Sequence, residues 1–185
     1  YGSNAIGGVV QIITKTPTQN AAFVSTEVGE HQTYKTILGV DAVENGFYAQ
    51  LRGQRMETDG TKIFDYVGAP DSSYDQKGFS GKFGYDSEDF ALSLEHSENS
   101  GRSQYQNFNW SNFAYQAKAH DFINQITTLK GDYQLAEHSQ VKARVSRFKY
   151  ELTQLDAPEK TMYISDEYEV NLSQQLSKNQ NLILG

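Results

Sequence analysis

After Pro17, apolar and polar residues alternate along most of the chain with a period of two. In the first such segment Ala22, Val24, Thr26 and Val28 fall on one face. The same alternation recurs around residues 36–42, 47–54, 79–86, 90–95, 127–135, 141–146 and 167–172, and a ninth segment begins near residue 181. Successive side chains of a β-strand point to opposite faces of the sheet, so the pattern predicts nine strands with one apolar and one polar face.

Charged residues fall on the polar side of these segments. They are Arg52, Lys82, Glu95, Lys130, Asp132, Arg144 and Glu169. Four aromatic residues, Phe47, Tyr85, Phe90 and Tyr133, fall on the apolar side close to short connections. Aromatic residues at strand ends are typical of the interfacial girdle of a membrane protein, although soluble sheets carry them as well.

The seventh segment changes phase. Its apolar residues are Val141, Ala143 and Val145, but after these come Phe148 and its alternate neighbours. The change predicts either a β-bulge near Arg147, or a strand that rises above a bilayer to a level where neither face has to be apolar.

The connections alternate in length. Those at 43–46, 86–89, 136–139 and 177–180 are short, whereas 60–77 and 100–122 are long, 153–160 is medium and 29–32 is short. Short turns at one end and longer loops at the other are typical of outer-membrane barrels, and a soluble sandwich has no reason to place its tight turns at one end. The predicted fold is an all-β, transmembrane, antiparallel up-and-down β-barrel, of which the chain supplies about nine strands.

Composition agrees with this interpretation. The 185 residues include 12 Tyr, 10 Phe and 15 Gly, but only 3 Pro. No apolar run approaches the roughly 20 residues that a membrane helix needs. There is no Cys, and therefore no disulfide framework or thiolate metal site. The net charge of −7 argues against a nucleic-acid partner, which a basic surface would attract.

Two connections carry candidate binding residues. Clustered carboxylates in 60–77 make Asp65, Asp71 and Asp75 candidates for calcium, which takes oxygen ligands; the alternative is a solvated acidic loop. Exposed aromatic residues among amides in 100–122 indicate either ligand contact or a loop that packs over the barrel mouth. The candidate ligand contacts are Arg102, Tyr105, Phe108, Trp110, Phe113 and Tyr115, together with Tyr66 and Tyr74 of the preceding connection.

Catalytic motifs are missing from the sequence. The four histidines have no second ligand at a metal-like spacing, and there is no nucleophile elbow. Gly2 and the pair Gly7-Gly8 do not form a phosphate loop, because no Gly-Lys-Ser/Thr follows them. We therefore expect a protein that is not an enzyme and that requires no cofactor.

The first residues, Tyr1-Gly-Ser-Asn-Ala-Ile-Gly-Gly-Val-Val-Gln-Ile-Ile-Thr14, resemble the end of the plug domain in TonB-dependent outer-membrane receptors. Tyr1, Gly2, Ser3, Gly7 and Gly8 carry the resemblance. The stretch 57–60 and the stretch 77–85 are also similar to the early barrel of that family.

The resemblance implies a fragment of a longer protein. Residues 1–17 would end the plug domain, and residues 18–185 would begin the barrel. The full-length protein would be a monomer in the bacterial outer membrane, in contact with its lipid. It would import a scarce metal chelate, most often an iron-siderophore, with energy from TonB, which would bind a region upstream of Tyr1. The alternatives are a cobalamin transporter of the same family, a passive porin or adhesin barrel, and an envelope enzyme built on a barrel.

Overall fold

A computed structural model describes residues 16–62, 71–157, 159–177 and 180–185. The plug-end motif at Tyr1, Gly2, Ser3, Gly7 and Gly8 lies outside these residues. The strands are β1 (Ala21–Gly29), β2 (Thr33–Glu44), β3 (Phe47–Thr58), β4 (Tyr74–Asp86), β5 (Phe90–Asn109), β6 (Ala114–Ala136), β7 (Ser139–Gln154), β8 (Lys160–Ser177) and β9 (Gln180–Leu184).

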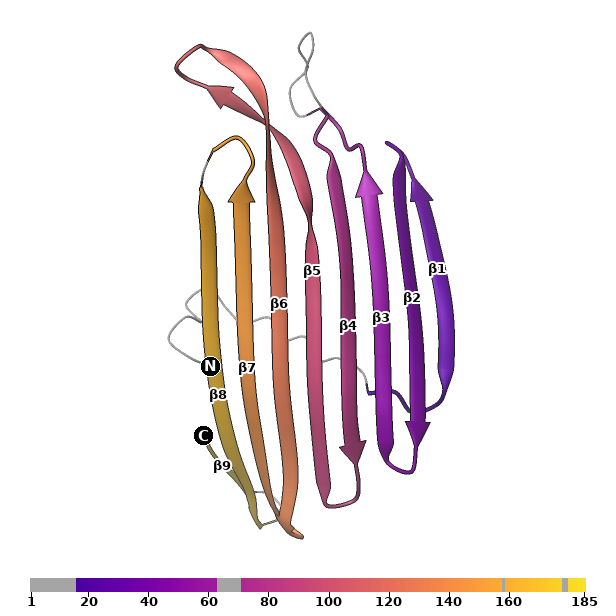
Figure 1. Ribbon diagram of the computed structural model, residues 1–185. Coiled ribbons are helices and arrows are strands. Elements are labelled where there is room, and N and C mark those ends of the chain that lie inside the picture. Colours follow the sequence, from indigo (N-terminus) through magenta and orange to yellow (C-terminus); the bar gives the residue numbers. More distant parts are fainter. Residues whose placement is uncertain (1–15, 63–70, 158, 178–179) are drawn as a thin grey trace.

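All nine strands form one antiparallel sheet in sequence order, so β2 to β8 each pair with the strand before and the strand after, and β1 and β9 pair with one strand each. Figure 1 shows a single layer with β1 and β9 at its two edges. The all-β meander and the position of every predicted strand are thus confirmed. Within the described residues the sheet is open and does not close into a barrel. No helix in this part of the chain is long and apolar enough to cross a membrane.

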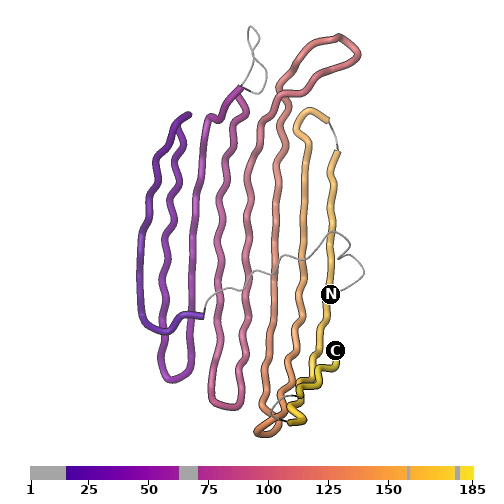
Figure 2. The backbone as a smooth tube through the Cα atoms, turned by 180° about the vertical axis from the view of Figure 1, so that it is seen from behind, coloured from indigo at the N-terminus to yellow at the C-terminus, as the bar shows by residue number. Residues whose placement is uncertain are grey.

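The connections after β2, β4 and β6 have two or three residues each and lie at one end of the sheet, here called the turn end. Asn45 and Gly46, which join β2 to β3, have φ values of 50° and 83°. Positive φ at both central residues is the signature of the tight hairpin turn whose twist matches that of the strands. The connections after β1, β3, β5 and β7 lie at the opposite end, here called the loop end, as both views show (Figures 1 and 2). Two of these, at 30–32 and 110–113, are also short, so the predicted contrast in connection length holds only in part.

The predicted loop 100–122 is wrong. β5 continues to Asn109 and β6 begins at Ala114, so only residues 110–113 form the turn. The two strands project beyond their neighbours as a twisted hairpin (Figure 1). The strands continue after the apolar alternation stops, because backbone pairing between strands does not require an apolar face.

The β-bulge predicted near Arg147 is also absent. Arg147 pairs in unbroken register with Thr127 on β6 and with Asp166 on β8. The register continues unchanged, and the apolar residues themselves change face. Phe148 and the apolar residues that alternate with it lie on the polar face, opposite Val145. Register shifts occur instead near the turn end, at 134–136 and 175–177.

The sheet has two unlike faces. The apolar face carries Leu51, Phe83 and Leu94, whereas the polar face carries Lys82 and its direct partners. Register places all seven charges predicted for the polar side on that face. The division between faces is therefore as predicted.

The molecule has almost no hydrophobic core. Among the described residues, Phe122 is the one large hydrophobic side chain that is buried. The accessible surface is 13296 Å², whereas a compact protein of 20.8 kDa exposes about 8,900 Å². A single layer of this kind leaves both faces open, so its stability depends on what covers them.

Candidate functional site

Large apolar side chains stand exposed across the apolar face. They include Val24, Leu38, Val40, Leu51, Phe79, Phe83, Leu92, Leu94, Leu129, Val145, Tyr168 and Val170, each between 42% and 76% exposed. Covering a side chain of this size is worth about 1.5–3 kcal/mol. Together they make a continuous surface that water covers poorly and hydrocarbon would cover well.

The border of this apolar surface runs obliquely across the strands. From the turn end, the first charge on the apolar face is Arg55 on β3 and Lys77 on β4, which pair directly. On β5 the first charge is Glu98, one side-chain row nearer the turn end, because it pairs with the residue two positions after Lys77. On β7 and β8 the first charges are Arg147 and Asp166, a further row down. β6 departs from this trend, because its first charge on the apolar face is Asp121, which pairs with Arg102 and lies nearer the loop end.

The border at the turn end descends in the same direction. Phe47 pairs with Tyr85, and their ring centroids are 4.7 Å apart. Phe90 pairs with Tyr133 one row further down. A side-chain row is the line of directly paired residues that runs across the strands. A shift of two rows over about five strands corresponds to an apolar band inclined about 30° to these rows, given the strand spacing and the rise per residue. A flat layer of hydrocarbon crossed by tilted strands produces such an oblique band.

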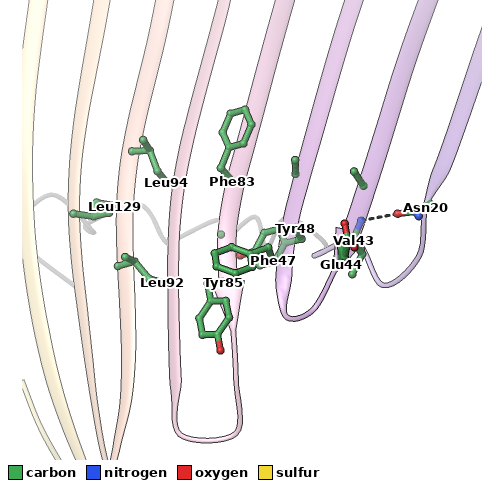
Figure 3. Close-up of a pocket in the computed structure, with 13 residues that line it drawn as sticks. Asn20, Val43, Glu44, Phe47, Tyr48, Phe83, Tyr85, Leu92, Leu94 and Leu129 are labelled. Carbon is green, nitrogen blue, oxygen red and sulfur yellow. Dashed lines mark hydrogen bonds between the residues drawn. The ribbon is translucent and has the colours of Figure 1, made fainter.

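A shallow apolar hollow of about 610 Å³ lies within the band near the turn end. The small side chains of Ala42 and Ala49 leave the space, and Phe83, Leu94 and Leu129 border it. Figure 3 shows these larger side chains spread along the neighbouring strands around an open surface. The hollow therefore belongs to the apolar band and offers no convergent polar groups.

The polar face holds paired charges within the same strands. Arg52 contacts Asp41 at 2.7 Å, and both side chains are mostly buried. The guanidinium of Arg52 also lies 5.0 Å from the centre of the Phe23 ring. Further along the face, Arg144 contacts Glu169 at 2.7 Å. Such pairing lowers the cost of covering these charged side chains when another part of the protein packs on the polar face.

The segment before β1 lies against this polar face. The ammonium of Lys82 donates a hydrogen bond of 3.3 Å to the hydroxyl of Thr16, and Pro17 beside it is buried. Lys82 itself is only 7% exposed. The described chain therefore enters the sheet from the polar face.

Aromatic side chains gather on the polar face towards the loop end. The rings of Tyr74 and Phe122 stack at 5.8 Å, and those of Tyr105 and His120 lie 5.6 Å apart. The Tyr105 hydroxyl donates a hydrogen bond of 3.4 Å to Gln154. Our sequence reasoning selected the two tyrosines and missed their partners. Counting alternate residues through 100–122 would have placed residues 118, 120 and 122 on the same face as Tyr105.

The predicted ligand contacts do not form one site. Phe108, Trp110, Phe113 and Tyr115 cluster at the tip of the β5–β6 hairpin, with Phe108 paired to Tyr115 across it. Tyr105 is three residues before Phe108 on the same strand, so its side chain lies on the opposite face of the hairpin. The remaining candidates separate further.

Arg102 forms a two-point ion pair with Asp121 on the apolar side, at 2.7 Å and 3.1 Å. Tyr66 lies outside the described residues. The candidate set thus divides into a tip cluster, an ion pair and the aromatic part of the polar face.

The calcium candidates are also dispersed. Asp75 belongs to β4 rather than to a loop, and its carboxylate lies 3.4 Å from the guanidinium of Arg55. Asp71 lines a polar hollow of about 620 Å³ that Lys62 shares. Asp65 lies outside the described residues. In the part of the chain that the structure describes, no three acidic, histidine or cysteine side chains come together as a metal site.

Neither the models of known protein families nor the curated proteins nor the solved structures contain a match to this chain.

Proposed function

We propose that the chain is the plug end and first nine barrel strands of a TonB-dependent receptor, which imports a scarce nutrient across the bacterial outer membrane. An iron-siderophore is the cargo that the resemblance favours, with cobalamin as the alternative. TonB would act on a region upstream of Tyr1. The resemblance rests on the motif Tyr1-Gly2-Ser3 and Gly7-Gly8, and on the meander that follows it.

The oblique apolar band is the observation that carries the membrane assignment. It is exposed, and its loop-end border descends from β3 through β5 to β7 and β8, with β6 as an exception, while its turn-end border descends in the same direction from β3 to β6. Every backbone group within hydrocarbon must be hydrogen-bonded, which a closed barrel achieves and an open sheet edge does not. The edges at β1 and β9 would therefore pair with strands supplied by the rest of the protein.

The polar face supports a lumen that is filled rather than open. Two of its charge pairs, Arg52 with Asp41 and Arg144 with Glu169, are in direct contact, and Thr16 and Pro17 lie on it directly before β1. A plug domain that precedes the barrel in sequence and occupies its interior would meet the wall in this way. A passive porin has no such preceding domain, and a water-filled pore favours unpaired, solvated charges.

Uptake by living cells tests this proposal. The gene for the full-length protein is deleted in its host, and accumulation of radiolabelled ferric siderophores and of cobalamin is measured with and without functional TonB. We expect one of these cargoes to lose saturable, TonB-dependent uptake in the deletion strain. Uptake that persists unchanged without TonB, while the protein still carries solutes, would instead indicate a passive pore.

A further inference from the structure

Residues 16–20, here called the strap, cross the polar face of the sheet before β1 begins. One end of the strap contacts β4 through Thr16, and the other end contacts β2 through Asn20. Figure 1 shows the strap running across the strands. A force applied to the chain upstream of Thr16 therefore passes along the strap before it reaches β1.

The contact at Thr16 is made by a buried lysine. The ammonium of Lys82 donates a hydrogen bond of 3.3 Å to the Thr16 hydroxyl, and only 7% of Lys82 is exposed. The same ammonium lies 5.8 Å from the centre of the Tyr48 ring on β3, and Lys82 pairs directly with Glu95 on β5. Pro17, the next residue of the strap, is also buried. Neighbours on both sides hold the lysine in place, and a charged donor forms a stronger hydrogen bond than a neutral one.

The contact at Asn20 extends the sheet by one hydrogen bond. Ala21 and Asp41 are the last pair in the ladder between β1 and β2. Two residues further along β2, the amide of Val43 donates a hydrogen bond of 2.6 Å to the side-chain oxygen of Asn20. The asparagine side chain therefore takes the place of a backbone acceptor on β1, which begins only at Ala21.

We propose that the strap is an anchor, which stops movement of the preceding domain at Thr16 and keeps force away from the β1–β2 ladder. A ladder that is pulled at one end opens one hydrogen bond after another, because only the terminal bond bears the load. The strap places two side-chain contacts, with β4 and with β2, ahead of the first pair in this ladder. The inference rests on the proposed function, in which energy from TonB acts on a domain upstream of the wall.

Single-molecule pulling on the full-length protein in a lipid bilayer tests the inference. The N-terminus is held at constant force while the extension is recorded. After the upstream domain has extended, we expect a pause, followed by a gain in contour length of about 17 Å, the extended length of five residues, when the strap detaches. Forced opening is governed by a rate, so the length of the pause measures the strength of the anchor.

Variants of the two contacts show what sets the pause. Thr16→Val keeps the shape of the side chain but removes its hydroxyl, and should make detachment about tenfold faster, the loss expected for a hydrogen bond to a charged group. Asn20→Ala should also shorten the pause, and Asn20→Asp, which keeps an acceptor oxygen, should restore it. Thr18→Val is the matched control, because Thr18 lies in the same strap and is exposed.

Each outcome decides. Equal pauses in Thr16→Val, Asn20→Ala and Thr18→Val overturn the inference, and so does an unsubstituted protein in which residues 16–20 extend together with the upstream domain. In both cases TonB-dependent uptake by cells would still support the proposed function. If the pause depends on Thr16 and Asn20 but cells show no TonB-dependent uptake of any cargo, the anchor stands and the proposed function fails. Heat-resistant migration of each variant in a gel shows that its barrel has formed before it is pulled.

Discussion

Phe23 on β1 and Arg52 on β3 contact each other across the intervening strand, with the guanidinium 5.0 Å from the ring centre. Gly39 on β2 lies between them in the same side-chain row. A Cβ atom at position 39 would lie 2.5 Å from the Phe23 ring and 2.7 Å from Cδ of Arg52. The glycine therefore permits the contact that fixes Arg52 beside Asp41.

We expect Gly39→Ala to destabilise the protein by about 1–3 kcal/mol, the usual cost of forcing extra volume into a packed site. Gly131→Ala is the control, because a Cβ there meets only Leu92 at 3.8 Å. Urea unfolding of the full-length protein, refolded into lipid vesicles, measures both. Equal stability of the two variants would show that Phe23 moves aside freely and that the contact contributes little. Removal of the ring in Phe23→Ala should relieve most of the cost of Gly39→Ala.

The two faces of β5 give a direct test of the lipid assignment. Leu94 lies within the apolar band, whereas Ser97 lies on the polar face three residues further along the same strand. Leu94→Arg should destabilise the protein in vesicles by about 2–4 kcal/mol, since an arginine near the bilayer midplane costs this much. Ser97→Arg should cost less than 1 kcal/mol if its side chain reaches water in the lumen. Similar losses in both variants would contradict a bilayer on the apolar side.

The strands were predictable because part of each strand lies in the apolar band, where one face is apolar and the sequence therefore alternates. Residues 127–135 alternate strictly, and β6 includes all of them. Nearer the loop end the constraint disappears, and sequence reasoning mistook the continuing strands for a loop. The segment after Val145 shows a second limit: a change of face and a bulge shift the apolar pattern in the same way, and only the register with β6 distinguishes them.

The candidate site was predictable only in part, because closeness in sequence does not determine which face a residue occupies. Tyr105 and Phe108 are three residues apart and lie on opposite faces of the hairpin. Phe122, which stacks on Tyr74, comes from the far end of the same hairpin and drew no attention in a sequence read as a loop. A strand assignment carried through these residues would have separated the two groups.

If the apolar band lies in the outer membrane as proposed, the turn and loop ends predict which side of the membrane each faces. The sequence has no cysteine, so Ser111→Cys at the hairpin tip and Ser87→Cys in the β4–β5 turn introduce single labelling sites into this region. We expect an impermeant maleimide to label Ser111→Cys on intact cells, and Ser87→Cys only after the outer membrane is opened. The unsubstituted protein is the control. The reverse order of labelling would place the turn end outside the cell.

The pH dependence of one contact follows from the ion pair that ties the hairpin to the β7–β8 connection. Lys118 contacts Asp156 at 3.0 Å, and the amide of Leu155 donates to the carbonyl of Ala119 beside it. The hydrogen bond from Lys118 lowers the pKa of the Asp156 carboxyl below its usual range. Because the folded pKa is lowered, the pair stabilises fully above the unfolded carboxyl's pKa of about 3.9, and this contribution is lost as the pH falls through the folded pKa.

We therefore expect the Asp156 carboxyl to titrate below pH 3.9 in the folded protein, as followed by carbon NMR of selectively labelled aspartate. Lys118→Met keeps the length of the side chain but removes the ammonium, and should return the midpoint towards 3.9. Hydrogen exchange at the Leu155 amide should become faster in the same variant, because its bond to Ala119 loses a neighbouring tether. A midpoint that does not move in Lys118→Met would show that the ammonium is too well solvated to hold the hairpin at this point.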